Sequence, residues 1–217
     1  MTPRAMRVVV LASGRGSNLG ALIEAAQAPD ARFEVVLVAG DRPEAQALRI
    51  AEAAGIATLA LDPRGYRDRA SFDADLFTRV AEHAPDLVVL AGFMRILDPG
   101  ALAPWVGRMI NIHPSLLPKY RGLKTHERAI GAGDAMHGAS VHFVTPELDG
   151  GPVISQADLP IEPGDTPATL AARLLPIEHR LLAATVDLIA QGRLALDGDR
   201  VRFDGEPLAA PLRTSAA

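Results

Sequence analysis

The sequence predicts an α/β protein built on a doubly wound, mostly parallel β-sheet, with an antiparallel strand addition at one sheet edge. In the first half of the chain, short runs rich in valine, leucine and alanine alternate with helical patterns. Such runs are typical of strands buried on both faces, and the alternation favours parallel strands with right-handed crossovers. In the second half, two strand-like runs are joined by a turn-rich loop, which predicts an antiparallel pair.

The first half supplies four strands and three helices. The strands are expected over residues 7–12, 33–39, 57–61 and 87–91, and the helices from the loop at 13–18 to Ala28, over 46–54 and over 71–83. Gly55 is expected to end the second helix, because glycine adopts the left-handed conformation found there without strain. Ser71 is expected to cap the third helix.

In the second half of the chain, the regular alternation of strands and helices ends. A short helix is expected near 99–106, a strand over 109–113, the antiparallel pair over 139–144 and 153–157, and a long helix over 166–191. Apolar residues recur in the long helix at helical spacing, and Pro176 inside it implies a kink or a distorted turn.

Length and composition are those of an ordinary globular protein. The 217 residues suit one domain over 1–217, with a core over 6–191 and a C-terminal tail over 192–217. The net charge of −4 gives no electrostatic case for a nucleic-acid partner, and the absence of cysteine excludes disulfides and thiolate chemistry. No apolar run has membrane-spanning length and no signal-peptide core precedes the first strand, so we expect a cytoplasmic protein that does not enter a membrane.

A glycine loop directly follows the first predicted strand and opens a helix. Its spacing, Gly14-x-Gly16 and then Gly20, does not match the dinucleotide fingerprint and disfavours an NAD-dependent oxidoreductase. Backbone N–H groups at a helix N-terminus attract phosphate, and Ser17 and Asn18 would add donors. The loop therefore predicts a site for one terminal phosphate; a tight turn with an asparagine cap is the alternative.

Asn111 and His113 lie two residues apart at the end of a predicted strand, so their side chains should face the same way. Ligands of open parallel sheets bind beyond the carboxyl ends of the strands. An amide donor beside a protonated imidazole suits stabilisation of an oxyanion on a carbonyl. Asp149 is the candidate carboxylate that keeps the imidazole charged. The alternatives are a structural Asn–His pair and a turn role for Asp149.

The remaining histidines give no convincing metal site. His137 and His142 could be combined with His113, but the spacings match no known ligand pattern and no cysteine assists, so no metal is predicted. The sequence also lacks a Gly-x-Ser-x-Gly elbow, a His-Glu-x-x-His motif and a Walker loop. The residues alone predict acyl-type transfer to or from a small phosphorylated molecule, without a covalent intermediate.

Four segments in this order resemble the folate-dependent phosphoribosylglycinamide formyltransferases of purine (IMP) biosynthesis. They are residues 14–18, 90–97, 111–118, and 138–142 together with 147–152, and the resemblance extends over about 7–191. It implies a formyltransferase-type, Rossmann-like fold and transfer of the formyl group of 10-formyltetrahydrofolate to the glycyl amine of 5'-phosphoribosylglycinamide. Formyltetrahydrofolate deformylase is the closest alternative activity, and a non-catalytic nucleotide-binding module is the alternative of another class.

The resemblance also implies a role for each matching residue. Asn111 and His113 would stabilise the oxyanion while Asp149 keeps His113 charged. The glycinamide ribonucleotide would be held at its phosphate by Gly16, Ser17 and Asn18 and at its ribose by Glu178, whose alternative is a solvated helix face. The formyl-folate would contact Arg69, Met94, Arg95, Ile96, Leu97, Asn111, Thr145, Pro146, Glu147, Leu148 and Asp149.

Three positions depart from the family pattern near the expected substrate contacts. Lys124 stands where some relatives carry histidine, and Leu175 and Pro176 stand where relatives tend to be polar, just before Glu178. Only small-molecule partners are expected, and the oligomeric state is left as monomer or homodimer.

Overall fold

The computed structural model describes residues 4–213. The chain forms two compact units, Met1–Ile110 and Asn111–Ala217. A single domain over the whole chain stays a prediction.

The first unit is a parallel α/β layer. Its strands lie in the order β4-β1-β2-β3, and β1 pairs in parallel with both β2 and β4. The elements are β1 (Met6–Leu11), α1 (Ser17–Ala26), β2 (Phe33–Gly40), α2 (Gln46–Ala53), β3 (Ala57–Ala60), η1 (Pro63–Gly65), α3 (Arg69–Glu82), β4 (Leu87–Leu90), α4 (Pro99–Leu102) and η2 (Ala103–Trp105).

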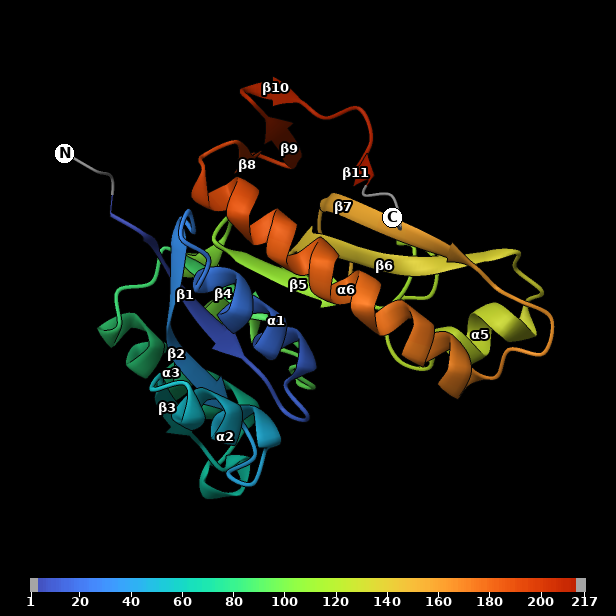
Figure 1. Cartoon of the computed structure of the whole chain (residues 1–217). Helices are drawn as coiled ribbons and strands as arrows, with labels where there is room; N and C mark the ends of the chain where they lie inside the picture. Colours follow the sequence, from blue (N-terminus) through green and yellow to red (C-terminus); the bar gives the residue numbers. More distant parts are fainter. Residues whose placement is uncertain (1–3, 214–217) are drawn as a thin grey trace. The chain divides into compact units, whose positions relative to one another are not determined.

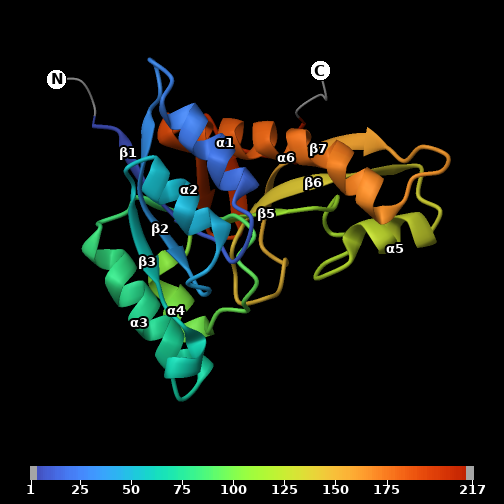
Figure 2. The ribbon, with the colours of Figure 1, turned by 60° about the horizontal axis from the view of Figure 1, so that its bottom comes forward.

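Helices cover both faces of this layer. Helices α1 and α2 lie beside each other on one face, and α3 lies on the other (Figure 2). The chain moves outward from β1 to β3 and then returns to β4, so right-handed crossovers place α3 opposite α1 and α2. Residues 8–11 of β1 are fully buried between the helices, as their unbroken apolar run predicts.

The predicted elements of the first unit are confirmed, but the predicted cap of the third helix is wrong. Helix α3 begins at Arg69 and its N-cap is Asp68, whose carboxylate accepts the Ser71 N–H at 2.8 Å. Ser71 lies three residues inside as the second member of a capping box, with its hydroxyl 3.3 Å from the Asp68 nitrogen. An aspartate and a serine both make good caps, so composition alone did not separate them.

The second unit carries the antiparallel addition. Its strands lie in the order β11-β7-β6-β5, where β6 and β7 are antiparallel and β11 runs parallel to β7. The elements are β5 (Met109–His113, which begins at the end of the first unit), α5 (Thr125–Gly131), β6 (Met136–Phe143), β7 (Val153–Pro160), α6 (Pro167–Ala190), β8 (Leu194–Asp197), β9 (Arg200–Phe203), β10 (Glu206–Pro207) and β11 (Leu212–Arg213). The long helix α6 lies along β6 and β7 (Figure 1).

The sequence determines where helix α6 begins. Thr166 is the N-cap, its hydroxyl accepts the Thr169 N–H at 3.2 Å, and Pro167 occupies the first turn, where a missing N–H costs nothing. The helix continues without a break through Pro176. Pro176 cannot donate to the carbonyl of Ala172, so one helical hydrogen bond is absent there.

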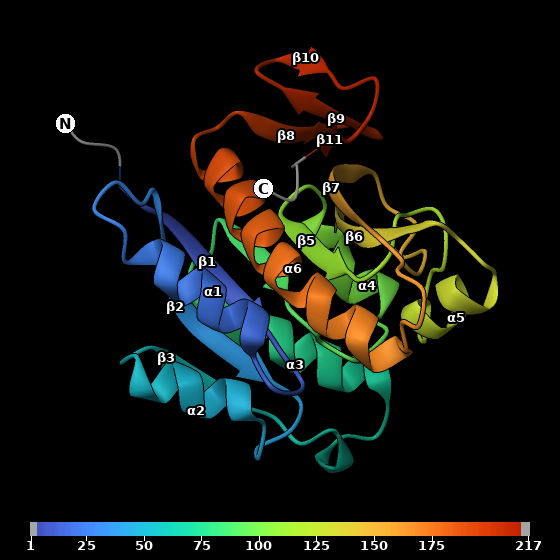
Figure 3. The same ribbon diagram turned by 45° about the vertical axis from the view of Figure 1, so that its right-hand side comes forward.

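The tail forms a small sheet of its own. Strands β8, β9 and β10 are antiparallel neighbours, seen above the end of α6 in Figure 3. Gly198 turns the chain between β8 and β9 with a φ of 62°, a conformation that favours glycine. In the part of the chain that the structure describes, no helix is both long and apolar enough to cross a membrane.

Candidate active site

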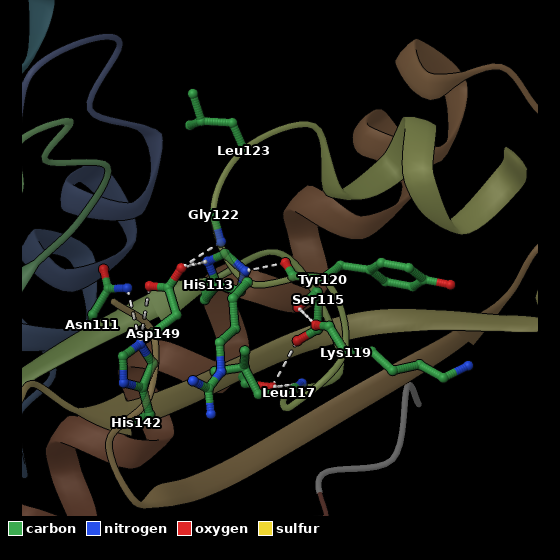
Figure 4. A network of polar contacts seen from close by, with 12 residues as sticks. Asn111, His113, Ser115, Leu117, Lys119, Tyr120, Gly122, Leu123, His142 and Asp149 are labelled. Atoms are coloured by element: carbon green, nitrogen blue, oxygen red, sulfur yellow. Dashed lines mark hydrogen bonds and ion pairs between the residues drawn. The ribbon is translucent and has the colours of Figure 1, made fainter. Parts of the chain in front are cut away.

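His113 ends strand β5 between two oxygen atoms (Figure 4). Its Nδ1 lies 3.5 Å from Oδ2 of Asp149, and its Nε2 lies 2.9 Å from the carbonyl oxygen of Tyr120. Only 5% of the residue is exposed. The predicted pairing of His113 with Asp149 is therefore present in the geometry of the second unit.

These contacts favour the doubly protonated ring of His113. The Tyr120 carbonyl can only accept, so Nε2 must carry a proton and donate it. In the neutral ring, Nδ1 would then turn a lone pair toward the Asp149 carboxylate, which is repulsive. In the imidazolium both nitrogens donate, and the negative charge of Asp149 stabilises the positive one.

Asp149 is held in a strained backbone conformation. Its φ is 48°, in the left-handed region that costs a non-glycine residue about 1–2 kcal/mol. The Gly122 N–H donates to Oδ2 of Asp149 at 2.8 Å and fixes the carboxylate. At Gly151, an added Cβ would lie 1.9 Å from the carbonyl oxygen of Phe143, so this position of the loop has room only for glycine.

His142 is the site residue that the sequence reasoning missed. The spacing of the histidines suggests only a metal-ligand role for His142, but His142 Nε2 lies 3.1 Å from Nδ2 of Asn111 (Figure 4). His142 Nδ1 lies 2.9 Å from the carbonyl oxygen of Phe143 and donates to it, so Nε2 is the acceptor. Burial lowers the pKa of His142, in agreement with a neutral ring.

The His142 contact fixes the amide of Asn111. One N–H of Asn111 is directed at His142, which leaves the second N–H of the same group for another acceptor. Asp149 closes the cluster, with Oδ1 3.7 Å from His142 Nε2. Asn111, His113, His142 and Asp149 thus form one polar cluster that combines an imidazole facing a carboxylate with an oriented amide donor.

Two further histidines of this unit, His126 and His137, pair with each other. His126 Nδ1 lies 2.9 Å from His137 Nε2. Burial lowers the pKa of both rings, that of His137 to about 4, so the pair is neutral near pH 7. Among residues 4–213 there is no group of three or more His, Asp or Glu side chains placed to hold a metal ion.

The buried His137 should make stability pH-dependent. The unfolded chain binds this proton below its ordinary pKa of 6.5 and the folded chain only below about 4, so stability rises with pH between these values. We expect the free energy of unfolding to rise by on the order of 3 kcal/mol across this window from His137, at about 1.4 kcal/mol per pKa unit. In His137→Gln, the free energy of unfolding measured with urea should rise less steeply with pH. An unchanged pH dependence would contradict the role of His137, and His83→Gln is the control.

The predicted phosphate loop lies in the first unit. Gly16 is the N-cap of α1 with a φ of 75°, and no side chain caps this helix end. The alternative of an asparagine cap is therefore wrong, because Ser17 and Asn18 lie in the first turn. With a glycine cap, the cap residue has no side chain that competes with a ligand for the N-terminus of α1.

Gly16 also has no room for a side chain. An added Cβ would lie 2.7 Å from the Cα of Ala47, whereas at Gly14 it would meet nothing within 4 Å. We expect Gly16→Ala to lower the free energy of unfolding by about 2–3 kcal/mol, from the left-handed conformation plus the clash. Gly14→Ala should change it by less than about 1 kcal/mol; urea unfolding of the pair tests this, and equal effects would contradict it.

The segment predicted to contact the folate follows β4 and has no regular secondary structure. Met94 and Ile96 are exposed, at 63% and 54%, whereas Leu97 is buried. The Arg95 guanidinium lies 4.3 Å from the centre of the Phe72 ring. Arg69 is the first residue of α3.

The other predicted folate contacts lie in the second unit beside Asp149. Leu148 is half exposed, and Glu147 forms an ion pair with Arg121. The Thr145 hydroxyl donates to the Glu147 carbonyl at 3.4 Å across Pro146, in a turn that leads to Asp149. An apolar side chain and charged groups thus border the Asp149 carboxylate.

Glu178 and the three residues that depart from the family pattern all lie in the second unit. Glu178 is buried on α6, so the alternative of a solvated helix face is wrong. Leu175 is half-buried and Pro176 exposed. Lys124 has a φ of 59°, caps α5 and lies 3.2 Å from Glu127.

Comparisons with known proteins give consistent matches over most of the chain. A sequence profile of the family described as "Formyl transferase" matches residues 6–186. Phosphoribosylglycinamide formyltransferase of Escherichia coli (strain K12) is 45% identical over 203 residues, which is 94% of this chain and 96% of that protein. The solved structure of phosphoribosylglycinamide formyltransferase from Coxiella burnetii has a TM-score of 0.93 at 44% identity, covering 97% of this chain and 99% of that one. The Haemophilus influenzae enzyme of the same name is 37% identical over 93% of this chain and 95% of that protein.

Proposed function

The chain belongs to the formyl transferase family, and we propose that it transfers the formyl group of 10-formyltetrahydrofolate to the glycyl amine of 5'-phosphoribosylglycinamide in purine synthesis. The chain is a transferase that uses a formyl-folate as cosubstrate. The observation that carries the finer proposal is the cluster of His113, Asp149 and an oriented Asn111, which suits an acyl transfer.

In the proposed reaction, the glycyl amine attacks the formyl carbon and forms a new C–N bond. The carbonyl oxygen becomes an oxyanion that accepts hydrogen bonds from the Asn111 amide and from protonated His113. Collapse of this intermediate breaks the bond to folate N10, and a proton passes from the attacking amine to that nitrogen, through water near Asp149. Donors held in place before the reaction are effective because they need not reorganise as the charge develops.

We assign ribonucleotide binding to two places. The N-terminus of α1 would take the phosphate, through backbone N–H groups at Gly16 and Ser17 and the side chain of Asn18. The glycine cap without a competing side chain supports this. Glu178 would accept hydrogen bonds from the ribose hydroxyls; its burial on α6 keeps the carboxylate off the solvated helix face, which supports a binding role.

We assign folate binding to exposed apolar groups and backbone. Residues 94–97 would contact the pteridine through backbone N–H and C=O groups, and Met94 and Ile96 offer it apolar surface. Arg69 would meet the carboxylates of the glutamyl end. In the second unit, Asn111 and residues 145–149 complete the proposed contacts. The chemistry requires no metal, and we propose a cytoplasmic monomer or homodimer that acts on small molecules only.

An absorbance assay of 10-formyltetrahydrofolate consumption tests the proposal. We expect conversion to tetrahydrofolate only when glycinamide ribonucleotide is added. Conversion at the same rate without the ribonucleotide, with release of formate, would indicate the deformylase. Ribonucleotide binding without turnover, unaltered in His113→Ala, would indicate a non-catalytic binding module.

A further inference from the structure

The segment at 92–98 lacks regular structure but is anchored by side chains at both ends. Near its start, the Met94 N–H donates to Oγ of Ser13 at 2.9 Å, and the Ser13 N–H donates to the Gly92 carbonyl at 3.1 Å. At its far end, the Asp98 N–H donates to Oδ2 of Asp73 at 2.6 Å. Both anchoring side chains are buried and belong to the first unit, as the segment does.

Between the anchors, the segment has both buried and exposed apolar side chains. Phe93 and Leu97 are buried, whereas Met94 and Ile96 expose more than half of their surface. Two exposed side chains contribute little packing energy, so the shape of this stretch depends on its buried neighbours and on the two anchors. The Asp98 carboxylate accepts the Gly100 N–H at 2.9 Å and starts α4, so the second anchor also fixes where that helix begins.

Asp73 is an unusual residue for the inner face of a helix. It is fully buried on α3, and its second oxygen, Oδ1, has no hydrogen-bond partner within the described part of the chain. Burial raises the pKa of Asp73. A buried polar atom without a partner costs about 1–3 kcal/mol, so an apolar residue would serve packing alone better. An apolar residue could supply neither the bond to the Asp98 N–H nor the negative charge that attracts Arg95 and Arg69, and Asp73→Asn separates the two because it keeps only the acceptor.

We propose that Asp73 is a positioning residue for formyl-folate binding, which holds the backbone of residues 94–97 in its binding shape through the Asp98 N–H, opposite Ser13. The inference rests on the proposed function, because that function assigns residues 94–97 to the folate. Asp73 does not touch the substrate: it is buried beneath the segment and acts through the backbone.

The test compares two replacements of similar shape. Asp73→Leu removes the acceptor, and Asp73→Asn keeps an acceptor oxygen for the Asp98 N–H. We expect Asp73→Leu to raise KM for 10-formyltetrahydrofolate by roughly 10-fold or more, which is the effect of losing one buried hydrogen bond. KM for the ribonucleotide and kcat should stay within about threefold, and Asp73→Asn should stay near wild type in all three. Glu82→Gln, an exposed change on the same helix, is the control.

An unchanged cosubstrate KM in folded Asp73→Leu would overturn the proposal, as would equal impairment of Asp73→Asn. If circular dichroism shows that Asp73→Leu does not fold, Ser13→Ala serves as the second variant. A selective rise in the KM for 10-formyltetrahydrofolate supports the anchoring of residues 94–97 by buried side chains, and an unchanged KM refutes it. Calorimetric binding of tetrahydrofolate to the same variants separates this inference from the proposed function. A wild-type protein without ribonucleotide-dependent turnover contradicts the function, while weaker tetrahydrofolate binding in Asp73→Leu than in Asp73→Asn still supports the positioning role.

Discussion

His113→Ala is expected to lower kcat by at least about 10²–10³-fold while the protein stays folded, because removing one oxyanion donor typically has this effect. The variant loses the imidazole that faces Asp149 and the Tyr120 carbonyl, so the negative charge that develops on the formyl oxygen has one donor fewer. Steady-state kinetics with circular dichroism of the purified variant measures both quantities. Asn111→Ala should show a loss of the same order.

The matched control for His113→Ala is His83→Ala, which removes an imidazole from the first unit, outside the cluster. It should keep kcat within about threefold, since substitutions away from special features have small effects. Near-wild-type turnover in folded His113→Ala would refute the role of His113 as oxyanion donor.

Asp149→Asn is expected to lower kcat by about 10²-fold or more with a smaller effect on KM. The substitution keeps the shape but removes the charge that favours the imidazolium of His113. An asparagine can also accept the Gly122 N–H, so the loop should keep its conformation. Ring ¹⁵N chemical shifts of His113 near neutral pH report its protonation directly, and we expect a shift from the doubly protonated to the neutral form.

Asp158→Asn is the control for this charge removal. Asp158 lies on β7 in the same unit and pairs only loosely with Arg213, at 3.7 Å. It should leave both the ¹⁵N shifts and kcat near wild type. If Asp149→Asn kept the doubly protonated shifts of His113 and wild-type turnover, the pairing of His113 with Asp149 would have no catalytic role.

Local pattern was enough to predict most of the fold. The apolar run of β1 and the turn-rich loop between β6 and β7 each determine their element with little help from the rest of the chain. Helix α5 was not predicted, because only Thr125 and Ala129 are buried on it and no apolar periodicity marks it.

Only the part of the candidate site that lies on one strand could be predicted from the sequence. Asn111 and His113 share a strand, so their common face follows from strand geometry. The contact of Asn111 with His142 depends on how β5 and β6 are aligned, which short sequence patterns do not specify. The same limit applies to Asp73, since its partner, the Asp98 N–H, lies 25 residues further along the chain.

The most direct test of the central claim follows the formyl carbon itself. With [¹³C-formyl]-10-formyltetrahydrofolate, glycinamide ribonucleotide and the wild-type protein, ¹³C NMR should show the label moving to the formamide of the ribonucleotide as tetrahydrofolate is released. Free formate should stay at background, and the transfer should disappear in His113→Ala. Label that appears as formate at the same rate with and without ribonucleotide would show that water is the acceptor and would contradict direct transfer.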